Sequence, residues 1–396
     1  MAEYLKRRIG LGLLITYGVG VMVGAGIYVL VGAVAGAAGI WAPLSFALAG
    51  LIAAPSALSY AELSTRIPEA AGEAAYIEKG LGLHHLAVLV GLAIVMAGTI
   101  SSAAVLRGGT GYLLGILDVP QTWLIIGLGV FLTGVAIIGV LESLALAALF
   151  TIVEVIGLFL VVGAGFNAPV LADWSVLPDQ TMLVGIGLGA SLAFFAFIGF
   201  EDIVNMAEEV KDPTRTLPRA ILISLIVTTS LYMLVTIAAL RGVPPEALAS
   251  SDRPLVLVWE TGTGRSAEFL AVIALVAALN GALAQIVMAA RVMFGLGKRS
   301  PRLALFHQVT PRFGTPLRAT ILLGGGVIFA ALMLPVAALA ELASGLLLSV
   351  FLLVNLSLIR LKRREPDAPF KVATWIPWAG LLAAFAALVF SGIGGV

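Results

Sequence analysis

The sequence contains no cysteine and few charged residues. Without cysteine, disulfide bonds, iron–sulfur clusters and thiol catalysis are excluded. Only 11% of the 396 residues are charged and 60% are hydrophobic, whereas soluble domains carry about 25% charged residues. The three histidines lack metal-ligand spacing, and no basic run is interleaved with aromatic residues as in nucleic-acid-binding proteins. The composition indicates an integral membrane protein, for which we expect no metal, no cofactor and no nucleic-acid partner.

Long hydrophobic runs predict eleven membrane-spanning helices of about 20 residues or more. These predicted spans, one to eleven, cover residues 9–36, 40–62, 85–114, 122–140, 143–166, 181–206, 219–240, 266–297, 316–334, 337–360 and 374–394. The predicted fold class is an all-α, multispan membrane protein. Because Lys6–Arg8 precede a full-length span rather than a short one, we expect no cleavable signal peptide.

The distribution of Lys and Arg residues predicts the orientation in the membrane. With the N-terminus in the cytoplasm, 18 of the 23 basic residues fall in inner segments, and only Arg241, Arg253 and Arg265 fall in outer segments. This bias follows the positive-inside rule, so we expect a cytoplasmic N-terminus and a location in the cell membrane. The remaining two, Arg107 and Arg291, lie within predicted spans.

Span one contains four glycines within nine residues at the depth of the bilayer core: Gly18, Gly20, Gly24 and Gly26. Glycine costs roughly 1 kcal/mol relative to alanine in a helix interior, so this density predicts a helix that interrupts itself. In lipid, such a break is tolerated only where protein or a water-filled cavity surrounds the freed backbone groups. Broken helices at mid-membrane are typical of the substrate sites of transporters.

The hydropathy pattern also contains a repeat. Spans one to five overlay spans six to ten, which predicts an inverted repeat of residues 1–166 and 167–361, followed by residues 362–396 with an additional span. In this overlay span one corresponds to span six, where the adjacent carboxylates Glu201 and Asp202 lie within an apolar segment. Two irregular helices at equivalent repeat positions indicate a site at the bilayer midplane.

Eight short motifs occur in order along nearly the whole chain. They are Gly24–Ile27, Leu58–Leu63, Pro68–Gly72, Phe194–Glu201, Ala207–Pro213, Leu217–Ala220, Ala290–Phe294 and Thr310–Pro316. Together they resemble the motifs of the amino acid–polyamine–organocation superfamily, close to permeases of the cationic-amino-acid-transporter type. The resemblance implies a five-plus-five inverted repeat of the LeuT type, with broken helices one and six, and transport by alternating access. Such permeases usually have twelve or more spans, against eleven predicted here.

A zwitterionic amino acid needs donors for its carboxylate and acceptors for its ammonium. From the polarity of helix ends and from the resemblance, we expect the amides of Gly24, Ala25 and Gly26 to bind the carboxylate. The predicted acceptors for the ammonium are carbonyls of Val21, Met22, Phe195, Ala196 and Ile198. For the glycines, the alternative is close packing of helices. The resemblance also assigns the ring of Phe195 to closing over the substrate.

Ionisable residues within the spans are candidates for coupling. Because charged groups in a bilayer are costly, we assign Glu201 to substrate binding, gating or protonation, or alternatively to capping a half-helix. In span five, Glu154 stands where several relatives have a lysine. Three roles are open for Glu154: a structural pair with Arg107, proton coupling, or direct substrate contact. Span eight has no serine or threonine between Ala267 and Gly297, which disfavours a sodium site.

These features predict a secondary active transporter of amino acids, not an enzyme, with an amino acid, protons and the lipid bilayer as partners. We expect proton symport and, because glycine, alanine and phenylalanine flank the predicted site, a preference for neutral amino acids. No Gly-x-x-x-x-Gly-Lys motif is present, so we do not expect ATP to drive transport. The alternatives are an exchanger, a cationic amino-acid or polyamine transporter, a passive channel, and a non-transporting sensor or subunit.

Overall fold

A computed structural model describes residues 9–69, 72–114, 118–138, 144–175, 177–207, 210–308 and 315–394. Within these ranges the regular secondary structure is helical, apart from one isolated β-bridge between Ile9 and Val210. The α-helices are α1 (Leu11–Ala25), α2 (Ile27–Ala38), α3 (Ala42–Arg66), α4 (Gly72–Leu81), α5 (His84–Leu114), α6 (Gln121–Ile138), α7 (Leu144–Asn167), α8 (Gln180–Phe194), α9 (Pro213–Gly242), α10 (Pro245–Ser250), α11 (Pro254–Thr263), α12 (Glu268–Arg299), α13 (Leu317–Met333), α14 (Val336–Arg364) and α15 (Ile376–Gly394). The 3-10 helices are η1 (Gly39–Trp41), η2 (Phe195–Phe197), η3 (Glu201–Met206) and η4 (Pro301–Phe306).

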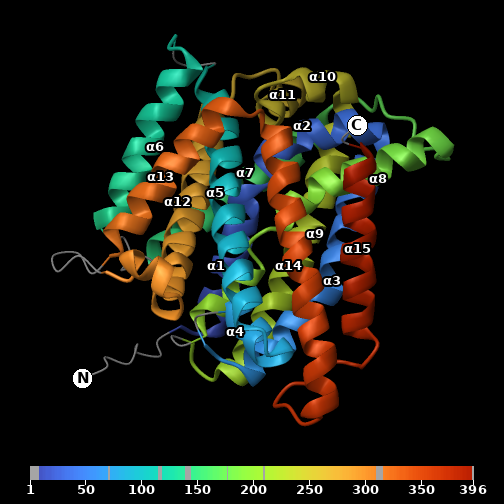
Figure 1. The fold of residues 1–396 in the computed structure, drawn as a ribbon. Helices are drawn as coiled ribbons and strands as arrows, with labels where there is room; N and C mark the ends of the chain where they lie inside the picture. Colours follow the sequence, from blue (N-terminus) through green and yellow to red (C-terminus); the bar gives the residue numbers. More distant parts are fainter. Residues whose placement is uncertain are drawn as a thin grey trace.

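The long helices coincide with the eleven predicted spans and form one bundle (Figure 1). Span one comprises α1 and α2, span two is α3, and spans three to five are α5, α6 and α7. Span six comprises α8, η2 and η3, and the remaining spans are α9, α12, α13, α14 and α15. Among the described residues, eight segments are long and apolar enough to cross a membrane, and three shorter apolar helices accompany them. The prediction of an all-α, multispan membrane protein is confirmed.

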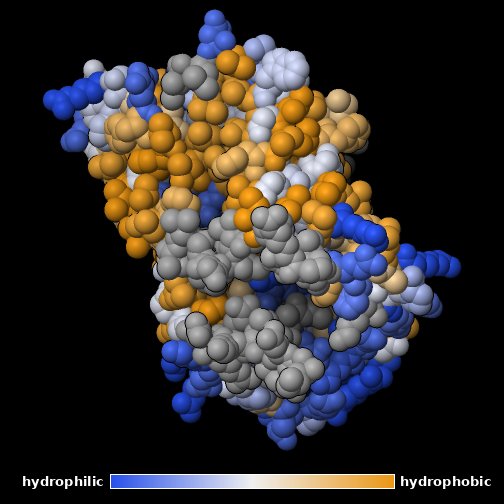
Figure 2. All heavy atoms as spheres, turned by 90° about the vertical axis from the view of Figure 1, so that its left-hand side faces the viewer, coloured by the Kyte–Doolittle hydropathy of each residue, from blue (hydrophilic) through white to orange (hydrophobic). Residues whose placement is uncertain are grey.

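Apolar side chains cover the outside of the bundle as well as its core. On α6 and α13, the side chains of Phe131, Ile321 and Phe329 are each more than half exposed. Figure 2 looks onto the side of the bundle where these two helices lie: hydrophobic residues gather over its upper part and hydrophilic residues at its lower end. Such a surface is suited to contact with lipid chains.

The helices at the centre of the bundle pair across the two predicted repeats. α3 packs against α9, and α5 packs against α12; these are the equivalent second and third spans of the overlay. The additional span, α15, packs against α14 and α3. The division into residues 1–166, 167–361 and 362–396 stays a prediction.

The first predicted interruption divides span one at Gly26. α1 ends at Ala25 and α2 begins at Ile27, and Gly26 between them has φ −125° and ψ −74°, outside the helical region. The break falls at the last of the four glycines, so the other three lie inside α1.

The second predicted interruption divides span six. η2 ends at Phe197, and the chain turns through Ile198–Phe200 before η3 begins at Glu201. Gly199 in this turn has φ +122°, a conformation that residues with a β-carbon rarely adopt. Glycine at this position therefore permits the helix to stop and restart.

Some residues named in the predictions fall outside the described ranges. They are Lys6–Arg8, Ala70 and Ala71, Glu208 and Glu209, and Thr310–Gly314. The side chain of Ala25 is likewise outside the description, so Ala25 enters the site only through its backbone.

Candidate functional site

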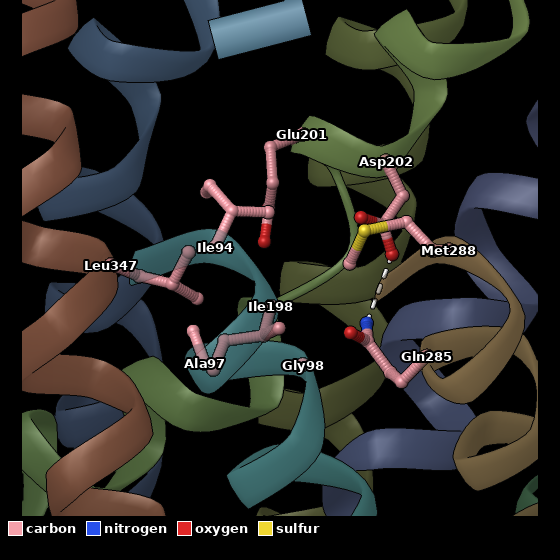
Figure 3. A pocket seen from close by; sticks show the side chains of 9 residues that line it. All are labelled: Ile94, Ala97, Gly98, Ile198, Glu201, Asp202, Gln285, Met288 and Leu347. Atoms are coloured by element: carbon pink, nitrogen blue, oxygen red, sulfur yellow. Dashed lines mark hydrogen bonds between the residues drawn. The ribbon is translucent and has the colours of Figure 1, made fainter. Parts of the chain in front are cut away.

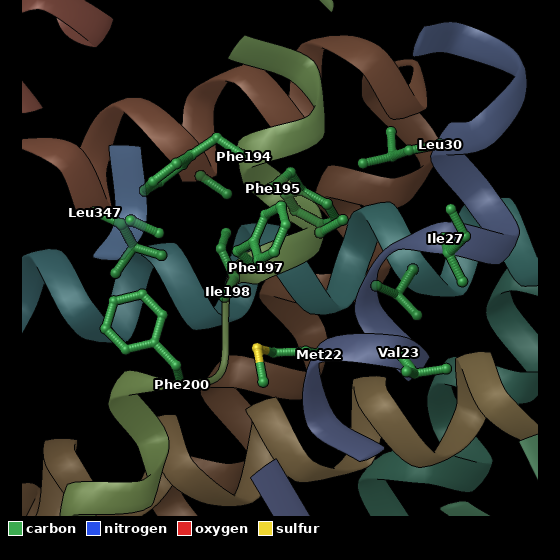
Figure 4. Packing of buried hydrophobic residues seen from close by; sticks show 14 of the residues in the cluster. Met22, Val23, Ile27, Leu30, Phe194, Phe195, Phe197, Ile198, Phe200 and Leu347 are labelled. Atoms are coloured by element: carbon green, nitrogen blue, oxygen red, sulfur yellow. The ribbon is translucent and has the colours of Figure 1, made fainter. Parts of the chain in front are cut away.

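The two helix interruptions contact each other inside the bundle, among the buried apolar residues of Figure 4. A β-carbon added to Gly26 would lie 2.5 Å from the Ala196 Cα, and one added to Gly199 would lie 2.5 Å from the Val21 Cγ1. Real β-carbons essentially never come within 3.0 Å of such atoms. Each interruption therefore uses a glycine to approach the other, and the two breaks form one structural unit.

The backbone amides at the first interruption are used differently from the sequence prediction. Gly24 and Ala25 lie inside α1, and the Gly26 N–H donates to the Val23 carbonyl at 3.2 Å. The three amides predicted to bind a carboxylate are thus engaged in the helix and its last turn in this conformation. Free donors are expected instead at the start of α2, from Ile27, because the first N–H groups of a helix have no partner within it.

One predicted carbonyl acceptor is released at this break. Because the Gly26 N–H donates to Val23, the Met22 carbonyl loses the donor that a continuing helix would place four residues along. Val21 lies one residue earlier. Its carbonyl keeps a donor in the helix, because the residue four positions along, Ala25, is still part of α1. Met22 is therefore the better acceptor of the two.

Two of the three predicted acceptors in span six, Phe195 and Ala196, already hold one donor each. The Phe195 carbonyl accepts the Ile198 N–H at 3.1 Å, and the Ala196 carbonyl accepts the Tyr232 hydroxyl at 2.9 Å. A carbonyl oxygen has two lone pairs, so each can accept a second donor. The Phe195 ring is fully buried and packs with its neighbours in the core.

The glycines inside α1 serve close packing, which was the alternative to a binding role. A β-carbon on Gly24 would lie 2.7 Å from the Ala277 carbonyl oxygen on α12. A β-carbon on Gly18 would lie 2.8 Å from the Ser224 Oγ on α9. Small residues let these helices approach closely, so only Gly26 is explained by the break itself.

A narrow crevice lies beside the second interruption (Figure 3). Its walls come from α5, from Ile198 in the turn, from η3, and from α12 and α14. Apolar side chains line most of it, and Glu201, Asp202 and Gln285 supply its polar atoms. The space between them is too narrow to admit a water molecule, so this conformation holds the crevice closed.

The two carboxylates of η3 have different partners, although both are at most 3% exposed. Glu201 Oε2 accepts the Gly199 N–H at 3.0 Å, which agrees with the alternative that Glu201 caps the break. Asp202 Oδ2 accepts from Gln285 Nε2 at 2.9 Å. Asp202 Oδ1 and Gln285 Oε1 are buried and have no hydrogen-bond partner among the described residues.

Glu154 joins α7 to the first interruption and to α12. The side chain is fully buried, and its Oε1 accepts from Asn280 Nδ2 at 3.3 Å. The Glu154 carbonyl accepts the hydroxyl of Tyr28, the second residue of α2, at 2.7 Å. Glu154 Oε2 is buried without a hydrogen-bond partner among the described residues. Tyr28 therefore connects the start of α2 to the backbone of Glu154.

The pair of Glu154 with Arg107, one of the three interpretations of Glu154, is not formed among the described residues, which corrects that interpretation. Arg107 Nη1 donates to the Ala331 carbonyl on α13 at 2.6 Å, and no ion pair joins Arg107 to Glu154 in the described part of the chain. Hydropathy gave the depth of the two charges but not the direction in which each side chain points. The guanidinium group of Arg107 donates to a backbone carbonyl instead.

Sequence reasoning missed a third acid near η3. Glu73 on α4 is 2% exposed, and burial raises its pKa to about 7. Its charge interacts with Glu201 and Asp202 although 128 residues separate Glu73 from Glu201. The sequence did not indicate that Glu73 is the buried acid, because Glu69, Glu73 and Glu78 look alike there.

A cluster around Glu62 was also missed. Glu62 is fully buried, and its Oε1 accepts from Arg66 Nη2 at 2.7 Å. Its Oε2 accepts from Lys362 Nζ at 2.6 Å and from the Val372 N–H at 2.8 Å. The spacing of Glu62 and Arg66 by four residues was a readable helix signal, but the other two partners are about 300 residues away.

Comparison with known proteins identifies the relatives of the chain. The profile described as amino acid permease matches residues 13–394. The vacuolar cationic amino acid transporter 4 of Arabidopsis thaliana is 32% identical over 350 residues, or 82% of this chain and 58% of that protein. The branched-chain amino acid permease BcaP of Bacillus subtilis is 30% identical over 391 residues, or 92% and 83%. The methylthioribose transporter of Bacillus subtilis is 29% identical over 375 residues, or 88% and 79%. The match thus spans little more than half the length of the Arabidopsis protein.

Proposed function

This chain belongs to the amino acid permease family, and we propose that it is a secondary transporter that carries amino acids across a membrane by alternating access. The observation that carries the proposal is the contact between the two helix interruptions, where Gly26 meets Ala196. Two broken helices that meet inside a membrane bundle present unpaired backbone groups to one place. The names of the relatives, a cationic amino acid transporter and a branched-chain amino acid permease among them, support amino acids as cargo and transport rather than catalysis.

The polarity of the break suits a zwitterion. The N-terminus of α2, starting at Ile27, would attract the carboxylate, because a helix start carries unpaired N–H groups and a partial positive charge. The released carbonyl of Met22 and the carbonyl of Ile198 would accept from the ammonium. Gly26 then lies between the acceptor carbonyl at the end of α1 and the donor N–H groups at the start of α2.

We place the N-terminus in the cytoplasm, and the protein in the cell membrane, on the strength of the asymmetry of Lys and Arg. The five-plus-five inverted repeat is part of the same proposal. It is supported by the packing of α3 on α9 and of α5 on α12, since each pair joins equivalent spans of the overlay. The corresponding breaks in spans one and six support it as well.

Proton coupling is assigned to Glu154. Its carboxylate is fully buried and takes part in no ion pair within the described ranges, and its backbone carbonyl accepts from Tyr28 beside the first interruption. An isolated acid in a bilayer marks an ion or proton pathway. A carboxyl group that meets water from alternate sides can take up a proton on one side and release it on the other. Exchange of one amino acid for another is the competing mode.

Reconstituted vesicles test transport and coupling together. Uptake of radiolabelled L-leucine and L-lysine would be measured with an inward pH gradient, and separately with unlabelled amino acid inside. Accumulation driven by the gradient indicates symport, and stimulation by internal amino acid alone indicates exchange. Flux without saturation would point to a channel, and binding without flux to a sensor; either result would overturn the proposal.

The Glu154→Gln variant tests the assigned coupling residue. We expect it to lose gradient-driven accumulation and to keep exchange, because glutamine preserves the bond with Asn280 but cannot carry a proton. Glu341→Gln, at an exposed position of α14, is the matched control. An unchanged uptake rate and pH dependence in Glu154→Gln would remove Glu154 from coupling.

A further inference from the structure

Helix α4 packs against α5 and α14 at the lower end of the bundle (Figure 1). It also touches the second interruption, because a β-carbon added to Gly72, its first residue, would lie 2.7 Å from the Asn205 Oδ1 of η3. A β-carbon added to Gly80, near the other end of α4, would lie 2.9 Å from the Ser357 Cα of α14. The backbone of α4 is therefore docked closely on η3 and on α14.

Four aromatic rings connect α4 to the second interruption. Tyr76 of α4 lies 6.1 Å from Tyr60 of α3, and Tyr60 lies 5.8 Å from Phe200, measured between ring centroids. Phe200 lies 5.2 Å from Phe351 of α14, measured in the same way. All four side chains are at most 1% exposed. Because Phe200 directly precedes Glu201, which lines the crevice, this ring cluster extends from α4 to the wall of the crevice.

Glu73 lies in this contact without a counter-charge. Its side chain is 2% exposed, and its Oε1 has no hydrogen-bond partner among the described residues. It takes part in no ion pair within the described ranges. The ionisable groups that face it are Tyr60 of α3, Tyr76 of α4, and Glu201 and Asp202 of η3. None of these groups is basic, so a charge on Glu73 would be buried, unpaired and next to other acids.

Two arginines near α4 are engaged elsewhere. Arg299, at the end of α12, forms ion pairs with Glu69 and Glu78. Arg360 of α14 donates to the carbonyl of Leu81, the last residue of α4, at 3.2 Å. These bonds hold α4 through more exposed acids and through its last residue, and neither arginine neutralises the buried acid on its inner face.

The protonation state of Glu73 decides whether its burial is favourable. Burial raises its pKa from 4.5 to about 7, because the uncharged acid is the form that an apolar site tolerates. If α4 left η3 and Glu73 met water, the pKa would return to its ordinary value. Rising pH therefore favours the undocked position of α4, by up to about tenfold per pH unit between the two values, and the effect levels off above about pH 7.

We infer that Glu73 is a proton-binding site whose occupancy keeps α4 docked on η3, and that loss of the proton opens the crevice from the side of α4. The closed crevice of this structure is then the protonated state. In the proposed orientation α4 faces the cytoplasm, so the site responds to cytoplasmic pH. This rests on the proposed function, transport by alternating access, to which it adds control of one opening. Glu73 on α4 is separate from Glu154 on α7, the residue assigned to coupling.

Because the chain contains no cysteine, single introduced cysteines can test this movement. Ala97→Cys places a thiol in the crevice, and Ala75→Cys places one on the docked face of α4; the two alanines are 1% and 5% exposed. Leu305→Cys, at a position that is 55% exposed, corrects for the greater reactivity of thiols at higher pH. The labelling rate with a small methanethiosulfonate reagent would be measured for each in nanodiscs, and the two buried positions expressed as ratios to Leu305→Cys.

Both ratios should rise by at least about tenfold between about pH 5.5 and 7.5 in the protein that keeps Glu73. With Glu73→Gln added, both should stay within about twofold of their values at the lower pH, because glutamine has no proton to lose. Glu69→Gln, an exposed position just before α4, is the matched control and should keep the rise. Histidines change charge in this pH range, and His84 beside Glu78 is present in every variant, so a response caused by His84 would persist in Glu73→Gln.

Two results would overturn the inference. The first is a ratio at either buried position that does not change with pH in the protein that keeps Glu73, and this measurement needs no acid variant. The second is a rise that persists in Glu73→Gln, because another group would then control α4. Labelling needs no transported amino acid, so both results leave amino-acid transport standing. Absence of uptake in the reconstituted vesicles would instead overturn the proposed function.

Discussion

Two buried carboxylates, Glu62 and Asp202, show how differently this bundle treats the same chemical group. Both are at most 1% exposed. Glu62 accepts from Arg66, Lys362 and the Val372 N–H, so both of its oxygens are satisfied. Asp202 accepts only from Gln285, and one of its oxygens has no partner within the described ranges.

The difference separates a carboxylate whose charge is balanced within the chain from one without a cationic partner in the described ranges. The Glu62 cluster joins the end of α3 to the end of α14 and to residues 365–373, which lead into α15. Its charges are neutralised from within the chain. Asp202 lines a crevice beside η3, and its Oδ1 has no hydrogen-bond partner within the described ranges. Burial alone therefore does not identify a functional acid in a membrane bundle; the state of its partners does.

The largest expected effect is on the Glu62 side of the comparison. Glu62→Ala should destabilise the protein by about 3–5 kcal/mol, because it leaves Arg66 and Lys362 buried without their counter-charge. The measurement is thermal unfolding in nanodiscs. Glu365→Ala is the control, because the Glu365 side chain is exposed and only its carbonyl accepts from Arg66. A melting temperature that falls equally in both variants would show that the cluster is not what holds these segments.

The sequence allowed the spans and the existence of both breaks to be predicted, because hydropathy and glycine content act locally. It predicted the region of the first break but not that Gly24 would pack on α12 and only Gly26 would interrupt the helix. The fate of individual amides depends on which carbonyl each one reaches, and this is set by a turn of one or two residues. In this conformation the amides of Gly24, Ala25 and Gly26 are engaged within the helix and its last turn, and their role in binding a carboxylate stays a prediction.

Side-chain partners were hardest to predict. A pair of Glu154 with Arg107 was one of three interpretations of Glu154, yet Arg107 bonds to Ala331 and Glu154 to Asn280. A hydropathy profile gives the depth of a residue along the bilayer normal. It does not give the face of the helix on which the residue lies, and partners from distant spans, such as Asp202 and Gln285, follow only from the packing of helices.

Glu73 provides an intermediate test, because it lies on α4, outside the spans, beside the acids of η3. Burial raises its pKa from 4.5 to about 7, so between these values the folded state binds more protons than the unfolded state. Stability should therefore fall as pH rises from about 4.5 to 7, by about 3 kcal/mol in total. The groups that face Glu73 are Tyr60, Tyr76, Glu201 and Asp202.

Glu73→Gln should remove this decline, since a glutamine carries no proton to lose. Melting temperatures between pH 4.5 and 8 would be compared for the unmodified protein, for Glu73→Gln and for Glu69→Gln, whose side chain lies just before α4 and is 58% exposed. If Glu73→Gln keeps the full pH dependence, the decline has another source. Glu73 would then be a satisfied acid and would belong with Glu62 rather than with Asp202.

The smallest expected effect on stability is also the sharpest test of the comparison. Asp202→Asn should change the free energy of unfolding by less than about 1 kcal/mol, because no buried cation loses its partner when the charge is removed. Asp202 and Glu62 are equally buried, so the two variants differ in whether a buried cation loses its partner. A loss for Asp202→Asn as large as that for Glu62→Ala would make Asp202 a second structural acid.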